Sequence, residues 1–420
     1  MPRSHTFAAA ALLAAVCAFS GAAVATADAP RDACESVYKT NDVDSLKRYD
    51  ACRFDRIDAK LDALSGTAPT SRPTASPTAS SRPPSSPAAT SQATSQISAP
   101  STTSAPATGS AATRILGPTR SGLPWHSGAW LGGRFNVASI EAFGAWRGRP
   151  ADVVTTYAPR DSYATMTDNT WSIGTWTGFA GRLNYGLSPL PDDGEGSLAS
   201  IGSGAQDAVW TKIARNLQDA GRGDSIVRVG WESNLKDWRW HVTSSNAAEF
   251  KAAFRRIVTT MRAEAPNLKF EFGVGCGSGL NGSSDRLAPL TRVYPGDDVV
   301  DLVGCDTYDW LNTHPTDAAS WAKTSAPDQG PGVADIVAFA RAHGKGASFG
   351  EWGLAETANG GGGGDNPFFI NTMYDFFYDN RDVVAFECYF DESDSYLVSS
   401  IFGSGQNPNA AVAYRNKYKD

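Results

Sequence analysis

An alternation of short apolar runs with amphipathic helical segments fills residues 113–420 and constrains the fold more than any other feature of the chain. Eight runs rich in β-branched and aromatic residues are expected to form strands, at 129–135, 152–157, 181–187, 225–231, 268–274, 299–305, 347–351 and 383–389. Between several of them, apolar residues recur at helical spacing, at 207–220, 247–263, 333–343 and 367–378. This order favours an α/β fold of the (β/α)8 type, the TIM barrel, over a doubly wound sheet.

Three segments of different composition precede the expected barrel. Residues 1–27 combine a basic start, an apolar run and a small-residue A-x-A site, the parts of a secretory signal peptide. Residues 66–112 are rich in Ser, Thr, Pro and Ala and lack acidic and aromatic side chains, so they are expected to form a disordered linker. The chain is therefore expected to be secreted to the extracellular space. No transmembrane helix is expected in the mature chain, because a span needs about 20 apolar residues.

The segment at 28–65 is too small to fold on hydrophobic burial alone. It has an apolar stripe at helical spacing over 54–64 and two cysteines, Cys34 and Cys52. We expect a small helical unit stapled by a Cys34–Cys52 disulfide. Contact with a cell surface or with a second copy of the chain is one interpretation of its role, and a structural remnant is another.

The charge and the aromatic content restrict the partners. The formal net charge of −7 argues against nucleic acid or an anionic membrane, because both need a concentrated positive field. All twelve Trp follow the linker, so the aromatic surplus belongs to the expected barrel. The five His are scattered without metal-ligand spacing, and no metal or cofactor is expected.

Two glutamates stand at the ends of expected strands. Glu232 follows the fourth strand and Glu351 ends the seventh, and each is flanked by Trp. In a (β/α)8 barrel the chemistry sits at the carboxyl ends of the strands. A surface pair of Glu232 with Arg228, or a solvated rim position for Glu351, would explain either residue alone. The two together predict a catalytic pair.

Two carboxyl groups across one cleft suit hydrolysis of a glycosidic bond with retention. At a separation of about 5–5.5 Å, one attacks the anomeric carbon while the other protonates the leaving oxygen and then deprotonates water. The mutual repulsion of the two charges keeps the acid protonated near neutral pH. We assign the nucleophile to Glu351 and the acid/base to Glu232.

Several segments resemble glycoside hydrolase family 26, a member of clan A of retaining (β/α)8 enzymes. The segment RVGWESN at 228–234, followed by Trp238 and Trp240, looks like its acid/base motif, and FGEWG at 349–353 is similar to its nucleophile segment. DLVGCDTY at 301–308 resembles its sixth strand, which implies that Tyr308 hydrogen-bonds the nucleophile. The opening at 128–154 also resembles the family, so the likeness covers most of 113–420.

One position departs from the family. Its members have His directly before the acid/base Glu, and clan relatives often have Asn, whereas this chain has Trp231. The glutamate pair is unaffected, but the departure weakens the expectation of β-mannan as substrate. The resemblance implies a retaining endo-β-glycanase acting on a polysaccharide, with β-mannan, β-1,3-xylan and β-glucan as the family's substrates. Because of Trp231, an unusual cell-wall polysaccharide is a further candidate, and the leader predicts that the enzyme is secreted.

Further residues are expected to bind the sugar. Tryptophan rings match the C–H faces of sugars, so stacking is expected at strand ends from Trp231, Trp238, Trp240, Trp310 and Trp352. Hydrogen bonds to the sugar or to the glutamate pair are expected from Asn234, Arg228, Asp306 and Tyr308, and more weakly from Glu387 and Asp391.

Three cysteines lie in the expected barrel. Cys276 and Cys305 follow neighbouring strands and are candidates for a bridge, which would leave Cys388 free. Buried free thiols are the alternative, because sequence does not fix the connectivity.

Two other functions fit parts of the sequence. A polysaccharide-binding barrel without catalysis would also explain the aromatic residues. A serine esterase is suggested by GASFG at 346–350, which matches G-x-S-x-G around Ser348. That motif needs a sharp turn after the strand at the serine, whereas Ser348 lies inside an expected strand, so the esterase is the weaker hypothesis.

Overall fold

The computed structural model describes residues 109–168, 170–310, 314–356 and 361–419. The expected signal peptide, the 28–65 segment with its Cys34–Cys52 bridge and nearly all of the linker lie outside the described residues. No helix in the described ranges is long and apolar enough to cross a membrane.

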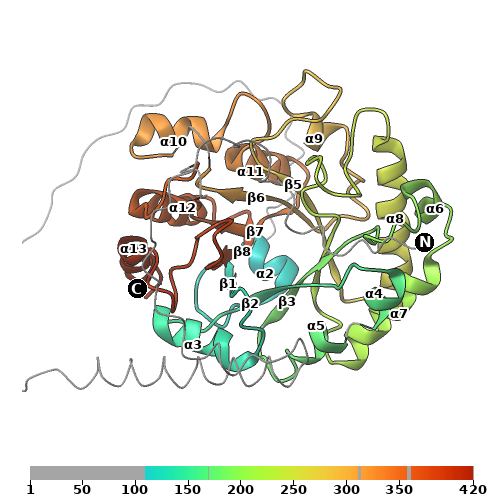
Figure 1. Cartoon of the computed structure of the whole chain (residues 1–420), viewed down its shortest axis with the longest axis horizontal. Helices are drawn as coiled ribbons and strands as arrows, with labels where there is room; N and C mark the ends of the chain where they lie inside the picture. The colour runs from blue at the N-terminus through green and yellow to red at the C-terminus, as the bar shows by residue number, and fades with distance from the viewer. Residues whose placement is uncertain (1–108, 169, 311–313, 357–360, 420) are drawn as a thin grey trace, which may run out of the picture. The chain divides into compact units, whose positions relative to one another are not determined.

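Eight parallel strands of the described chain close into a barrel in sequence order, with β8 paired to β1 (Figure 1). The (β/α)8 fold is therefore confirmed. The strands are β1 His126–Trp130, β2 Val153–Tyr157, β3 Arg182–Leu187, β4 Ile226–Val229, β5 Lys269–Gly275, β6 Leu302–Tyr308, β7 Gly346–Gly353 and β8 Val384–Phe390.

Helices surround this barrel (Figure 1). Those with strong amphipathic patterns form where they were predicted; in α7, Trp210, Ile213, Ala214 and Leu217 make one buried stripe at helical spacing. The helices are α2 Ala111–Leu116, α3 Val137–Arg147, α4 Tyr163–Thr167, α5 Thr170–Gly174, α6 Leu198–Gly202, α7 Asp207–Asp219, α8 Ala247–Glu264, α9 Ala288–Thr291, α10 Ala318–Ser325, α11 Val333–Ala342, α12 Pro367–Asp379 and α13 Pro408–Tyr418.

Helix α2 closes the amino-terminal end of the barrel. Its Leu116 packs with Val153, Ile226 and Leu302, which stand at the starts of their strands. The Ser110 side chain caps the helix, so residues 110–112, which were predicted to end the linker, belong to this capped helix. Because α2 covers the amino-terminal end of the barrel, a substrate site is expected at the carboxyl end of the strands.

Two strands differ from their predicted ranges by three residues or more. The first ends at Trp130 rather than at 135, because the chain turns away at Gly132, whose φ of 58° suits glycine. The sixth starts at Leu302 rather than at 299, because Val299 and Val300 instead close a turn onto the Gly296 carbonyl. The later start places Asp306 and Tyr308 inside β6, near its carboxyl end.

A disulfide joins the carboxyl ends of β5 and β6. Cys276 and Cys305 are bridged with a Cα–Cα distance of 5.4 Å, which confirms the suggested pairing, and Cys388 is free and buried. The Cys276 amide also donates to the Asp306 carbonyl. The bridge therefore ties these strand ends together directly beside Asp306.

Candidate active site

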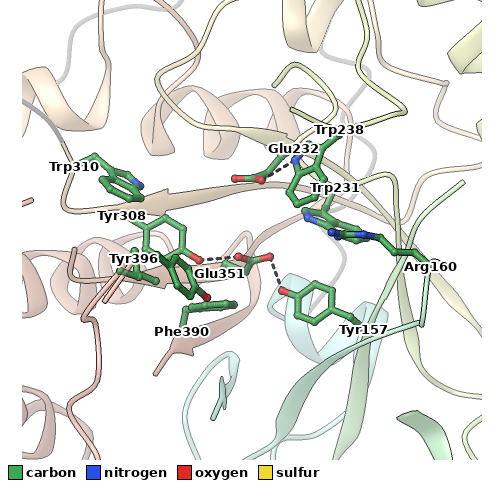
Figure 2. Close-up of a pocket in the computed structure, with 11 residues that line it drawn as sticks. Tyr157, Arg160, Trp231, Glu232, Trp238, Tyr308, Trp310, Glu351, Phe390 and Tyr396 are labelled. Carbon is green, nitrogen blue, oxygen red and sulfur yellow. Dashed lines mark hydrogen bonds between the residues drawn. The ribbon is translucent and has the colours of Figure 1, made fainter. Parts of the chain in front are cut away.

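A pocket of about 280 Å³ opens at the carboxyl ends of the strands, with both predicted catalytic glutamates in its wall (Figure 2). The size is at the lower end for ligand pockets, enough to enclose a short part of a polymer. The lining residues come from β2, β6, β7, β8 and the loops after β2, β4, β6 and β8: Tyr157, Arg160, Trp231, Glu232, Trp238, Tyr308, Trp310, Glu351, Phe390, Tyr396 and Leu397.

Glu351 lies within β7 and is hydrogen-bonded by three donors. The Tyr308 hydroxyl donates to Oε2 at 2.7 Å, while the Tyr157 hydroxyl and Arg228 Nη1 donate to Oε1 at 2.5 and 2.9 Å. Burial, followed by the nearby Glu351 charge, raises the pKa of both tyrosines well above the ordinary value, so both stay protonated and donate. These three donors stabilise Glu351 as a carboxylate.

Arg228 lies under the pocket and holds three carboxyl groups. Besides Glu351, it donates to both oxygens of Asp306, at 2.5 and 2.6 Å, and to Glu271 at 3.2 Å. Burial raises the pKa of Asp306 and of Glu271, against the opposing effect of Arg228. One guanidinium cannot balance three buried anions, so a proton in this cluster is the physical expectation.

Glu232 has a different environment and a different backbone. It stands beyond the end of β4 with φ of 48°, a left-handed conformation that costs energy for a side chain other than glycine. Burial, and secondly the charge of Glu351, raise its pKa to about 7, while a hydrogen bond from Trp238 Nε1 at 3.0 Å lowers it. Glu232 is therefore suited to carry a proton at neutral pH.

The loop that carries Glu232 is fixed to β5 by its neighbours. Asn234 accepts from the Gly275 amide at 2.7 Å and donates to the carbonyls of Gly275 and Ser278. Both polar atoms of its amide are thus bonded to β5 and the turn after it, so the structure gives Asn234 an anchoring role in place of the predicted contact with sugar.

The predicted binding residues divide between the pocket wall and the layer behind it. Trp231, Trp238, Trp310 and Tyr308 line the pocket. Arg228 and Asp306 are buried and do not line the pocket; Arg228 donates to the lining residue Glu351, and Asp306 is bonded to Arg228. The suggested pair of Arg228 with Glu232 does not form, because Arg228 is taken by the three other carboxyl groups.

The predictions for Trp240 and Trp352 as sugar platforms are wrong. Both are fully buried. Successive side chains of a strand point to opposite faces, so with Glu351 directed at the pocket, Trp352 faces outward and packs on Phe369 and Phe377 of α12. Trp240 lies behind Trp238 and donates from Nε1 to the Trp231 carbonyl.

The remaining candidates lie away from the pocket. Glu387 is fully buried and accepts from Trp352, Trp125 and Tyr418. Asp391 is buried in an ion pair with Arg134. Ser348 lies inside β7 with no exposed surface, so it cannot act as the nucleophile of an esterase.

Sequence analysis missed five pocket residues: Tyr157, Arg160, Phe390, Tyr396 and Leu397. Tyr157 and Phe390 end their strands, so the strand-end argument that found Glu351 would also have found them. Arg160, Tyr396 and Leu397 stand on loops, where no periodic pattern predicts the direction of a side chain.

Known proteins resemble this chain at low identity. No family model matches it. It is 30% identical over 212 residues to Endoglucanase H of Acetivibrio thermocellus, covering 47% of this chain and 21% of that protein. It is 33% identical over 134 residues to a mannan endo-1,4-beta-mannosidase of Bifidobacterium adolescentis, covering 30% of this chain and 13% of that protein. The chain thus matches less than a quarter of either relative's length.

Solved structures share the fold. A catalytic domain of a family 26 endo-beta-1,4-mannanase from Bacillus sp. JAMB-750 matches with a TM-score of 0.53 at 18% identity, covering 74% of this chain and 89% of that one. A modular family 26 endo-beta-1,4-mannanase of Cellulomonas fimi matches with a TM-score of 0.53 at 17% identity, covering 74% of each chain. The chain shares its fold with these family 26 mannanases. This family 26-like barrel, named for that likeness, has both Glu232 and Glu351 in its pocket wall.

Proposed function

We propose that the family 26-like barrel is a retaining endo-β-glycanase, with Glu351 as nucleophile and Glu232 as acid/base. One observation carries the proposal: two carboxyl groups line one pocket in opposite electrostatic settings. Three donors stabilise Glu351 as an anion, whereas burial raises the pKa of Glu232 to about 7. Unequal carboxyl groups are what a double displacement needs.

The reaction would run in two steps. A Glu351 oxygen attacks the anomeric carbon while Glu232 gives its proton to the glycosidic oxygen, so the bond to the leaving sugar breaks and a glycosyl ester forms. Glu232, now ionised, then takes a proton from water, and the resulting hydroxide displaces Glu351 from the anomeric carbon. Arg228, Tyr157 and Tyr308 hold the attacking carboxylate in place during the first step.

The substrate we propose is a β-linked polysaccharide, with β-glucan ahead of β-mannan. The longer match is to a protein named an endoglucanase and the shorter to one named a mannosidase. Trp231, where family 26 has His, is almost fully buried in the pocket wall beside Glu232 and gives this subsite an apolar lining. β-1,3-Xylan and an unusual cell-wall polysaccharide are further substrates to test.

We further propose that the protein is secreted. The leader-like residues 1–27 and the Ser/Thr/Pro-rich tract at 66–112 support this proposal, as an exported catalytic domain on a tether could move over an insoluble polymer. Residues 28–65 would then provide contact with a cell surface or a second copy.

The test is a screen of the full chain against β-glucans, β-mannans and β-1,3-xylan. Product size distinguishes endo from exo action, and the anomeric configuration of the first product is read by proton NMR. Reducing ends that appear in the β-configuration, and are absent with an E351A variant, support the proposal. Inverted products would overturn the mechanism, and binding without bond cleavage would identify a polysaccharide-binding protein instead.

A further inference from the structure

Both faces of the Trp238 ring are covered, although the ring lines the pocket. Trp240 stacks on one face with ring centroids 4.9 Å apart and planes within 7° of parallel. The guanidinium of Arg160 lies over the ring at 5.0 Å from its centroid, and with Trp240 on one face it covers the other. Figure 2 shows the Arg160 side chain reaching toward the tryptophan rings of the pocket wall. A sugar cannot stack on a ring covered in this way.

Neighbouring loops hold Arg160 over the ring. Asp192, in the loop after β3, accepts from Arg160 Nε at 2.9 Å, and its own amide donates to the Arg160 carbonyl at 2.6 Å. Arg239, between the two stacked tryptophans in sequence, donates to the carbonyls of Gly194 and Glu195 in the same loop. The loops after β2, β3 and β4 therefore meet around Trp238.

The edge of Trp238 has one acceptor, the carboxyl group of Glu232, at 3.0 Å from Nε1. The other charged groups that face Glu232 are Glu351 on β7, Arg228 on β4, Asp306 on β6 and Asp237 on its own loop. Arg228 already holds three carboxyl groups, so its charge is largely balanced. Trp238 thus donates the hydrogen bond by which this site stabilises an ionised Glu232.

We propose that Arg160 is a positioning residue for the acid/base: clamped by Asp192 over Trp238, it strengthens the hydrogen bond that the indole N–H donates to Glu232. A cation over an indole face draws electron density from the ring, which makes its N–H a stronger donor. The same positive charge also favours the anionic form of Glu232 through space. Both effects help Glu232 to release its proton, as bond cleavage requires. The effect on catalysis rests on the proposed function. The effect of Arg160 on the pKa of Glu232 through Trp238, here called the coupling, does not.

The coupling has a direct measurement in the full chain labelled with ¹⁵N-Trp. The Trp238 indole signal is identified by its loss in W238F, and its chemical shift is followed from pH 5 to 9. Wild type should titrate with the midpoint of Glu232, and E232Q should abolish that titration. R160M, which keeps a long side chain but removes the charge, should raise the midpoint by about half a pH unit.

Two variants act as matched controls. R160K keeps a cation and should stay closer to wild type than R160M. R255M removes an arginine of α8 that is paired with Asp298 in the same way but lies on the outer surface, and it should leave the midpoint unchanged. An R160M midpoint equal to that of wild type, or an R255M shift as large as that of R160M, would overturn the proposal.

Kinetics distinguish this role from direct binding of sugar. If Arg160 acts through Trp238, R160M moves the basic limb of the kcat/KM profile upward by the same half unit and leaves KM nearly unchanged. If R160M instead raises KM and leaves the basic limb of the kcat/KM profile at the same pH, Arg160 binds sugar directly and the proposal is refuted. If wild type hydrolyses no glycoside, the proposed function fails, and the indole titration still decides the coupling.

Discussion

Glu351 on β7 and Glu387 on β8 are two buried carboxyl groups on adjacent strands, and both are surrounded by aromatic donors. Glu351 accepts from two tyrosines and an arginine, and Glu387 accepts from two tryptophans and a tyrosine. Glu351 opens onto the pocket, whereas Glu387 has no exposed surface. The donor set alone therefore does not distinguish a catalytic carboxylate from a structural one; access to a pocket and to a second carboxyl group does.

The largest expected effect is at Glu351. E351Q should reduce kcat/KM by about four orders of magnitude or more, because the amide cannot attack the anomeric carbon. The free energy of unfolding, measured by urea denaturation, should fall by a similar amount in E351Q and E387Q, because each loses a carboxylate that accepts from three donors, so only activity separates the two variants. Activity of E351Q near that of wild type would remove the distinction between the two residues.

The second largest effect on activity is expected at Glu232, and its size should depend on the leaving group of the substrate. E232A should slow hydrolysis of polysaccharide by about 10²–10⁴-fold, because general acid catalysis is lost. An aryl glycoside with an acidic phenol needs little protonation, so its first step should be much less affected. Stopped-flow release of the phenol provides the measurement, and an equal loss on both substrates would contradict the acid/base role.

The pH dependence follows from the raised pKa of Glu232. The first step needs the protonated form, so kcat/KM should be retained below about pH 7 and fall as pH rises through it, by about tenfold per unit. Initial rates from pH 5 to 9, with stability checked at each pH, measure this limb. A constant kcat/KM up to pH 9 would show that Glu232 is not the acid.

The smallest effect on activity should come from Glu387. E387Q leaves at least one buried Trp or Tyr donor without an acceptor, so the free energy of unfolding should fall by about 1–3 kcal/mol. The kcat per folded molecule should remain that of wild type. Loss of kcat in fully folded E387Q would place Glu387 in the active site after all.

The sequence predicted the fold well where burial alone decides. The strands β2, β3 and β5 and the helices α7, α8, α11 and α12 form within one or two residues of their predicted ranges. These strands are largely apolar and buried on both faces, and these helices have buried residues at helical spacing. The first and sixth strands shifted because turns at Gly132 and Gly296 depend on backbone conformation, which an apolar run does not reveal.

The site was predicted in part. Glu232, Glu351 and Tyr308 meet as expected, because the end of a strand is a property that sequence can supply. Trp352 was predicted to line the pocket, but side chains alternate between the faces of a strand, so the neighbour of Glu351 points to the outside of the barrel. The role of Glu271 was not predicted, because it depends on an ion pair with Arg228, which lies on another strand, and the sequence does not show that contact.

The three donors to Glu351 come from three different strands, β2, β4 and β6, and none stands on a loop. The loop after β8, which carries Tyr396 and Leu397, can therefore be exchanged without moving the nucleophile. The loop after β4 cannot, because its backbone places Glu232 and its Trp238 hydrogen-bonds it. For an engineer, the barrel offers a fixed reaction centre with a replaceable rim on one side, so grafts at 393–396, the exposed part of this loop, are the place to change which sugars enter.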